Sequence, residues 1–240
     1  MYEIYLIILV VAFLYASVGH GGASGYLAIM SLYNFAPETL KPTALMLNLF
    51  VAGISFLHYY KKGYFKKRLF TVFAISSIPA AFLGGMISLD PDIYKKILGV
   101  LLIFAVLRIL GVFGSHTDDI NQPKWVPGLF IGAVIGFFSG LIGIGGGIIL
   151  SPVILLLGWG NVKETAAVSA LFIWVNSLAG MAGLVSSGVT FADHLYIFVA
   201  VAVVGGFLGG YVGSHKWNLK SLKLVLSIVL IMACFKLILA

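Results

Sequence analysis

Two glycine clusters interrupt long apolar stretches and could expose backbone groups that bind a ligand. Gly143-Ile144-Gly145-Gly146-Gly147 lies between Trp125 and Leu157, and Gly19-His20-Gly21-Gly22 lies between Ile4 and Leu32. Glycine adds backbone freedom and removes side-chain bulk, so we expect the helix to break at each cluster. Lipid cannot satisfy the freed N–H and C=O groups, which must therefore face protein, water or a ligand.

A helix that begins at such a break points its free N–H groups and its positive dipole end into the protein. This arrangement binds anions without a cationic side chain. The amides that we expect to contribute are those of Gly21, Gly22 and Ala23 and those of Gly145, Gly146 and Gly147, while Gly19, His20 and Gly143 complete the two clusters.

Neutral polar side chains supply the other candidates. Apart from Arg108 and Lys236, which lie near segment ends, we expect no charged residue deep in a predicted segment. Asn48 and Asn176 are the strongest, since an amide in an apolar helix needs partners, although an interhelical hydrogen bond would also explain each one. The serines are weaker candidates, because a serine can bond to its own helix. The full set is Ser24, Asn48, Ser139, Ser169 and Asn176, with Ser17, Ser55, Ser177, Thr43 and Thr165 as further possibilities.

His20 stands where the second cluster has Ile144. A protonated imidazole there could bind an anion or carry a proton with the substrate. A neutral imidazole that donates one hydrogen bond is the alternative interpretation.

Other kinds of site find little support in the sequence. No His, Cys, Asp or Glu cluster has metal-ligand spacing, and Cys234 is the only cysteine. The second cluster lacks the Gly-Lys-Ser/Thr of a phosphate-binding loop. We therefore expect no metal, no cofactor and no catalytic residues.

Composition indicates an integral membrane protein. Of the 240 residues, 61% are hydrophobic and 10% charged, and the mean hydropathy is +1.10. Most apolar segments reach the 18 or more residues that a helix needs to cross a bilayer, and the alternation typical of barrel strands is absent. The net charge is +7, and the basic residues lie in short loops between apolar segments. Their role in orienting a membrane protein explains this placement better than nucleic-acid binding does. We expect a multi-pass protein of a bacterial-type inner membrane, with the lipid bilayer and a small anion as its partners.

The chain contains an internal repeat, which divides it into membrane repeats at 1–120 and 121–240. Besides the glycine clusters, Leu40 to Phe50 aligns with Val162 to Phe172, and Phe82-Leu83-Gly84-Gly85 aligns with Phe207-Leu208-Gly209-Gly210. Generic glycine-rich helix packing is the alternative. The predicted apolar segments are 4–18, 23–33, 43–60, 69–88, 94–113, 126–142, 147–158, 166–186, 194–213 and 222–239.

The distribution of basic residues favours two inverted repeats. If each glycine-broken segment crosses the membrane once, six basic residues lie on the side of Lys61 to Arg68 and seven on the other. If each segment returns as a hairpin, the count is ten against three, which agrees with the excess of Lys and Arg on cytoplasmic sides. The predicted fold is therefore all-α, and each repeat is a re-entrant hairpin plus three transmembrane helices.

These motifs resemble those of the TauE/SafE family of sulfite exporters and related anion permeases. The resemblance rests on the segment from Ser139 to Gly147, on Pro152, on the segment from Thr165 to Leu171, and on the first-half copies Gly19 to Gly22 and Pro42 to Ala44. It implies a carrier for a small anion such as sulfite, sulfoacetate or another sulfonate. His20 departs from the Gly-Ile/Val-Gly-Gly form expected of the family, which places equal use of the two half-sites in question.

The leading hypothesis is a secondary transporter that exports a small anion, bound at the half-helix N-termini near the midplane between the repeats. The alternatives are an anion channel on the same frame, an intramembrane enzyme that uses His20 with a serine, and a structural subunit without a substrate. The chain could act alone or as a homodimer.

Overall fold

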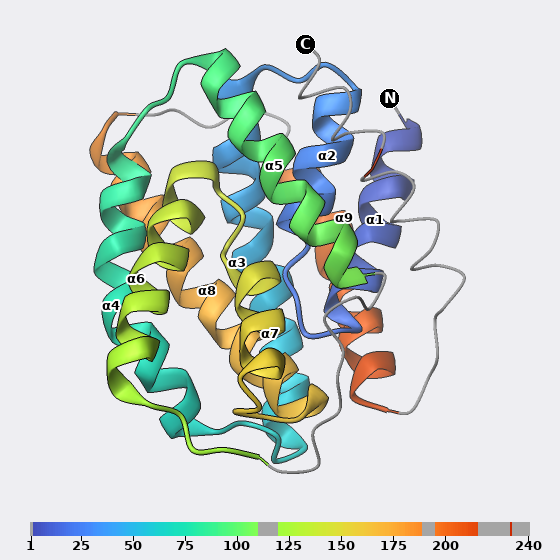
Figure 1. The fold of residues 1–240 in the computed structure, drawn as a ribbon. Helices are drawn as coiled ribbons and strands as arrows, with labels where there is room; N and C mark the ends of the chain where they lie inside the picture. The colour runs from blue at the N-terminus through green and yellow to red at the C-terminus, as the bar shows by residue number, and fades with distance from the viewer. Residues whose placement is uncertain (1, 110–119, 189–194, 216–230, 232–240) are drawn as a thin grey trace.

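Helices make up all the regular secondary structure in the part of the chain that the computed structural model describes, which is residues 2–109, 120–188, 195–215 and 231. The helices are α1 (Tyr2–Ala16), α2 (Ala23–Leu32), α3 (Pro37–Lys61), α4 (Lys67–Met86), α5 (Pro91–Ile109), α6 (Trp125–Ile142), α7 (Gly147–Leu156), α8 (Val162–Ser186) and α9 (Leu195–Ser214) (Figure 1). Apart from Ile231, the predicted segment at 222–239 lies outside the described residues.

Five of these helices, α3, α4, α6, α8 and α9, are long and apolar enough to cross a membrane, and α1, α2 and α7 are shorter apolar helices. The prediction of an all-helical membrane fold is confirmed. The predicted segments on either side of the second cluster, 126–142 and 147–158, were each expected to be marginal for a full crossing. Instead α6 has 18 residues, enough to cross alone, while α7 has only 10, or about 15 Å.

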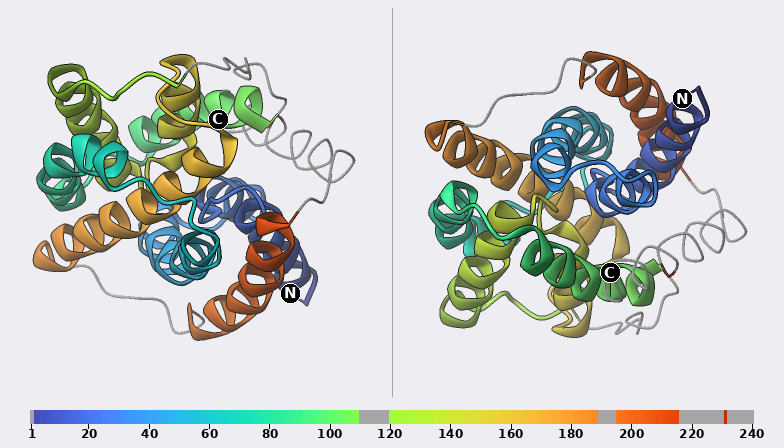
Figure 2. Two further views of the ribbon diagram at one scale, coloured as in Figure 1. Left: turned by 90° about the horizontal axis from the view of Figure 1, so that it is seen from below. Right: turned by 90° about the horizontal axis from the view of Figure 1, so that it is seen from above.

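Glycines join the helices into two close pairs that lie on opposite sides of the molecule, as Figure 2 shows. In one pair, Gly132, Gly136 and Gly140 of α6 lie directly on backbone atoms of α4. In the other, Gly205, Gly209 and Gly213 of α9 lie on the carbonyls of Leu9 and Phe13 of α1 and of Ser17, which directly follows α1. Such contacts let helix backbones approach closely without the help of a hydrophobic effect.

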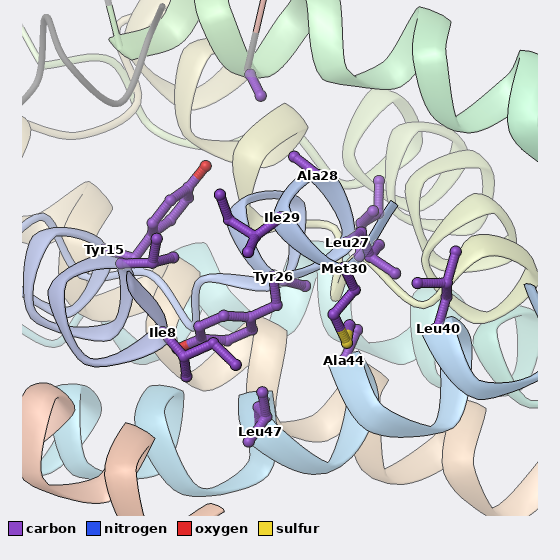
Figure 3. Close-up of a cluster of buried hydrophobic side chains, with 14 of the residues drawn as sticks. Ile8, Tyr15, Tyr26, Leu27, Ala28, Ile29, Met30, Leu40, Ala44 and Leu47 are labelled. Atoms are coloured by element: carbon purple, nitrogen blue, oxygen red, sulfur yellow. The ribbon is translucent and has the colours of Figure 1, made fainter. Parts of the chain in front are cut away.

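A cluster of buried apolar side chains surrounds α2 and fixes its position against α1 and α3. Tyr26, Leu27 and Met30 are fully buried among residues that include Ile8 and Leu47 (Figure 3). Elsewhere, large apolar side chains such as those of Val126, Phe130 and Tyr196 are exposed, as lipid-facing positions require.

The two ends of the molecule differ in charge. The lower end in Figure 1, called the basic end below, carries Lys61, Lys62, Lys66, Lys67, Arg68, Lys124 and Lys163. Glu164 pairs with Lys66 at 3.2 Å there, and Arg68 donates a hydrogen bond to Gln122. These residues are the described members of the group predicted to be cytoplasmic; Lys216, Lys220 and Lys223 lie outside the described residues.

One predicted boundary was wrong. Pro37 and Pro42 were expected in a connection before a segment at 43–60, but α3 begins at Pro37 and continues through Pro42. A proline is tolerated at the first helical position, and Pro42 removes only one backbone hydrogen bond close to the exposed start of the helix. As a result, Lys41 lies inside a helix.

Candidate functional site

Both glycine clusters break helices, as predicted. Gly22 is the N-cap residue of α2 with φ +98°, and Gly146 is the N-cap residue of α7 with φ +75°. These left-handed conformations favour glycine. In Figure 1, α2 occupies the upper half of the molecule and α7 the lower half, so the two short helices run away from a common middle level.

The two breaks meet on either side of Asn48 and Ile173. A methyl group at Gly21 or Gly145 would overlap the Asn48 carboxamide and would approach Ile173 Cγ2 to 3.0 and 2.7 Å, respectively. Asn48 belongs to α3 and Ile173 to α8, and both are buried. Glycine is therefore required at both positions by the close packing of the breaks around one point.

Asn48 occupies the N-terminus of α2. Its Oδ1 accepts a hydrogen bond from the Ala23 N–H at 3.2 Å, and its Nδ2 donates to Ser177 Oγ at 3.2 Å. An oxygen of the protein thus takes the amide of Ala23 that we expected to be open to an anion. The interhelical hydrogen bond considered as the alternative role of Asn48 is present.

His20 connects the first break to α7. Its Nε2 lies 3.1 Å from the Gly147 carbonyl oxygen and 3.0 Å from Ser151 Oγ, and its Nδ1 lies 3.0 Å from the Val18 carbonyl oxygen. Ser151 Oγ lies 2.8 Å from Ser169 Oγ on α8. A chain of polar groups therefore runs from the first break through α7 to α8.

Within the described residues, unpartnered polar groups lie on the helices around the N-terminus of α7, and the unpartnered Tyr26 hydroxyl lies beside Gly22 at the N-terminus of α2. Gly146 packs against Ile135 and Ser139 of α6 and against Phe172 of α8, and among the described residues no side chain accepts a hydrogen bond from the first turn of α7. Ser139 Oγ is buried without a hydrogen-bond partner. Asn176, one turn beyond Phe172, donates from Nδ2 to the Phe172 carbonyl at 2.8 Å, but its buried Oδ1 has no partner. Such groups are costly unless something satisfies them.

Three predicted site residues lie apart from these contacts. Ser24 is 2.6 Å from the Tyr15 hydroxyl, an interaction between α2 and α1. Gly19 packs against Ala166 near the start of α8, and Gly143 packs against Lys41 near the start of α3.

Ser151, Ile173 and Lys41 contact the two glycine breaks but were not among the predicted site residues. Ser151 is a polar residue one turn after Gly147, and that position was the available signal. Lys41 aligns with Lys163 in the repeat, but it was assigned to a loop; it is 7% exposed. Ile173 gave no signal, because apolar residues surround it in the sequence. Within the described residues, no group of three His, Cys, Asp or Glu side chains could hold a metal ion.

Comparison with known proteins identifies the chain. Residues 4–237 match the family model of the sulfite exporter TauE/SafE. The chain belongs to the TauE/SafE family.

Similar proteins occur in two bacteria, Sinorhizobium fredii and Bacillus subtilis. The probable membrane transporter protein y4hK of Sinorhizobium fredii is 37% identical over 233 residues, which cover 95% of this chain and 94% of the relative. The probable membrane transporter proteins YunE and YjnA of Bacillus subtilis are 28% and 25% identical, over 82% and 98% of this chain and 79% and 99% of their own lengths. No solved structure matches the chain significantly.

Membership in the TauE/SafE family confirms the predicted resemblance. The chain is a multi-pass membrane transporter and not an enzyme. The hypothesis of an intramembrane enzyme using His20 is therefore set aside.

Proposed function

We propose that this TauE/SafE protein is a secondary transporter that exports a small anion such as sulfite or an organosulfonate, bound at the N-terminus of α7. The observation that carries the proposal is the pair of unpartnered groups on the helices that flank Gly146, Ser139 Oγ and Asn176 Oδ1. The first N–H groups of α7 and the Ser139 hydroxyl are donors that an anion would satisfy. The Asn176 oxygen is an acceptor, which suits an anion with an O–H group, such as hydrogen sulfite.

The two halves contribute unequally in this proposal. At α2 the Asn48 oxygen takes the Ala23 amide, whereas among the described residues no side chain accepts a hydrogen bond from the first N–H groups of α7. We therefore assign the main anion contacts to Gly145, Gly146 and Gly147, and a supporting role to Gly21 and Gly22. His20 bonds to the Gly147 carbonyl and so holds the first turn of α7 in place.

We further propose that the chain consists of two inverted repeats, at 1–120 and 121–240. Support comes from two equivalent contacts between the halves. Gly84 of α4, in the first half, lies on the Phe137 carbonyl of α6, in the second. Gly209 of α9, in the second half, lies on the Phe13 carbonyl of α1, in the first. The phenylalanines are 124 positions apart (137 − 13) and the glycines 125 (209 − 84), as the sequence repeat requires. The opposite directions of α2 and α7 support hairpins that enter from opposite ends, and transport would follow from one repeat moving against the other.

Sulfite efflux from proteoliposomes tests this proposal. Ser139→Ala and Asn176→Ala each remove one unpartnered group, and we expect each to lower the initial rate at least fivefold while the protein remains folded. Ser77→Ala is the matched control, because Ser77 is equally buried but bonds only to the Ala74 carbonyl of its own helix. Unchanged efflux in the folded variants would refute the site.

A counterflow measurement separates a carrier from an anion channel. Sulfite inside the liposomes should accelerate the uptake of labelled sulfite if the protein alternates between two states. Large unitary currents in a planar bilayer, without acceleration, would support the channel instead.

A further inference from the structure

A pocket of about 140 Å³ opens at the end of the molecule opposite the basic end. Exposed residues form its rim: Glu38, Ile87, Ser88 and Ser187. Its buried floor includes Lys41, Tyr94 and Leu141. None of the residues assigned above to the α7 site lines it, so it is a separate feature.

Lys41 is a buried cation in this floor whose partners are neutral. Its Nζ donates to the Gly85 carbonyl at 2.9 Å and to the Ile87 carbonyl at 3.2 Å, at the C-terminal end of α4. The negative end of the helix dipole favours an ammonium group there. No carboxylate within the described residues pairs with Lys41, and a buried charge held only by carbonyls can exchange them for an anion, which makes stronger hydrogen bonds.

Two residues of the pocket floor, Lys41 and Tyr94, also contact the second glycine break. The Tyr94 hydroxyl donates to the Ile142 carbonyl at 2.9 Å, where α6 ends. A methyl group at Gly143 would lie 3.2 Å from Lys41 Cγ. Lys41 and Tyr94 therefore separate the pocket from the segment that leads to Gly146 and the N-terminus of α7.

We propose that this pocket is the outer opening through which the exported anion leaves and that Lys41 is its gate. A small oxyanion of the sulfite or sulfonate class replaces the carbonyls of α4 on the Lys41 ammonium. The exchange releases the end of α4 from the start of α3 and opens a path past Gly143 to α7. The inference rests on the proposed function in one respect, which is that the substrate is an anion.

Lys163 provides a matched control at the basic end. It aligns with Lys41 in the repeat, and its Nζ donates to the Gly213 and His215 carbonyls at the end of α9. Loss of Lys163 should therefore remove a similar set of hydrogen bonds without changing the pocket that Lys41 lines.

Cysteine labelling tests this outer opening directly. Leu141→Cys places a reporter in the pocket floor of the full chain, in a Cys234→Ser background. Anionic and cationic methanethiosulfonates of similar size are added from the side on which Ser88 is exposed. We expect the anionic reagent to react at least threefold faster, and methanesulfonate to slow its reaction. Lys41→Met should abolish both effects, whereas Lys41→Arg and Lys163→Met should retain them.

The outcomes separate this inference from the proposed function. An anion preference that persists in folded Lys41→Met, or that Lys163→Met removes equally, would overturn the gate. If Lys41→Met does not fold, the absence of methanesulfonate protection in the protein with Lys41 intact would overturn it. If Lys41→Met and Lys163→Met both export sulfite at the wild-type rate, the transporter proposal stands and the outer opening gated by Lys41 is refuted.

Discussion

Asn48 of α3 donates a hydrogen bond to the hydroxyl of Ser177 of α8 at 3.2 Å, across 129 positions of the chain. The other end of the same carboxamide accepts the Ala23 N–H at the start of α2. One side chain thus joins the two longest helices and occupies the N-terminus of a third, between the two glycine breaks.

Replacing Asn48 by aspartate should strongly reduce transport but leave the protein folded. The carboxylate can still accept hydrogen bonds from the Ala23 amide and the Ser177 hydroxyl. Its charge would lie against Gly21 and Gly145, and two like charges about 8 Å apart repel by roughly 2 kcal/mol at an effective dielectric constant of 20. We expect sulfite efflux to fall more than tenfold. Ser177→Ala, which leaves the Ala23 bond intact, should have a small effect, and wild-type efflux in Asn48→Asp would show that no anion passes Asn48.

Gly84→Ala and Gly209→Ala should destabilise the protein to a similar degree. Each added methyl group would overlap a backbone carbonyl, of Phe137 and Phe13 respectively, and the paired helices would have to separate. Overpacking of this kind costs about 1–3 kcal/mol. Thermal unfolding in detergent measures the effect. Gly53→Ala is the control, because its nearest neighbour is the Trp174 side chain at 3.1 Å, which can shift. Equal melting temperatures for all three variants would contradict the close packing.

The serine pair between α7 and α8 should show coupled effects on stability. Ser151→Ala leaves the buried Ser169 hydroxyl without this partner, at a cost of about 1–2 kcal/mol. Ser169→Ala should cost less, since Ser151 still bonds to His20. The double variant should then be no less stable than Ser151→Ala alone. Unfolding in mixed micelles measures this cycle, and additive losses would argue against a direct bond.

The basic end should face the cytoplasm. Lys and Arg concentrate on the cytoplasmic side of membrane proteins, and seven described basic residues lie at this end. Gly63→Cys and Ser88→Cys, in a Cys234→Ser background, mark the two ends. An impermeant thiol reagent on intact cells should label Ser88→Cys, and should label Gly63→Cys only after permeabilisation. The reverse pattern would invert the proposed orientation.

Much of the fold was predictable from the sequence. The apolar lengths and the glycine clusters predicted membrane helices with two breaks, because a bilayer demands about 20 apolar residues per crossing and glycine alone suits the left-handed turns at Gly22 and Gly146. Asn48, Ser139 and Asn176 were found as candidates, because a polar side chain is conspicuous in an apolar helix. Family membership was equally readable from the motifs.

Only the tertiary structure decided which hydrogen-bonding groups near the two breaks have partners within the protein. Nothing local distinguishes the amides of α2 from those of α7, yet Asn48, 25 positions away, takes the Ala23 amide. The sequence placed Lys41 in a loop. In the structure its helix continues through Pro42, and its hydrogen-bond partners are carbonyls more than 40 positions away at the end of α4. The sequence by itself determined where the chain must break within the membrane. Hydrogen bonds between distant helices, which no local pattern encodes, decided that the Ala23 amide at the first break is taken by Asn48.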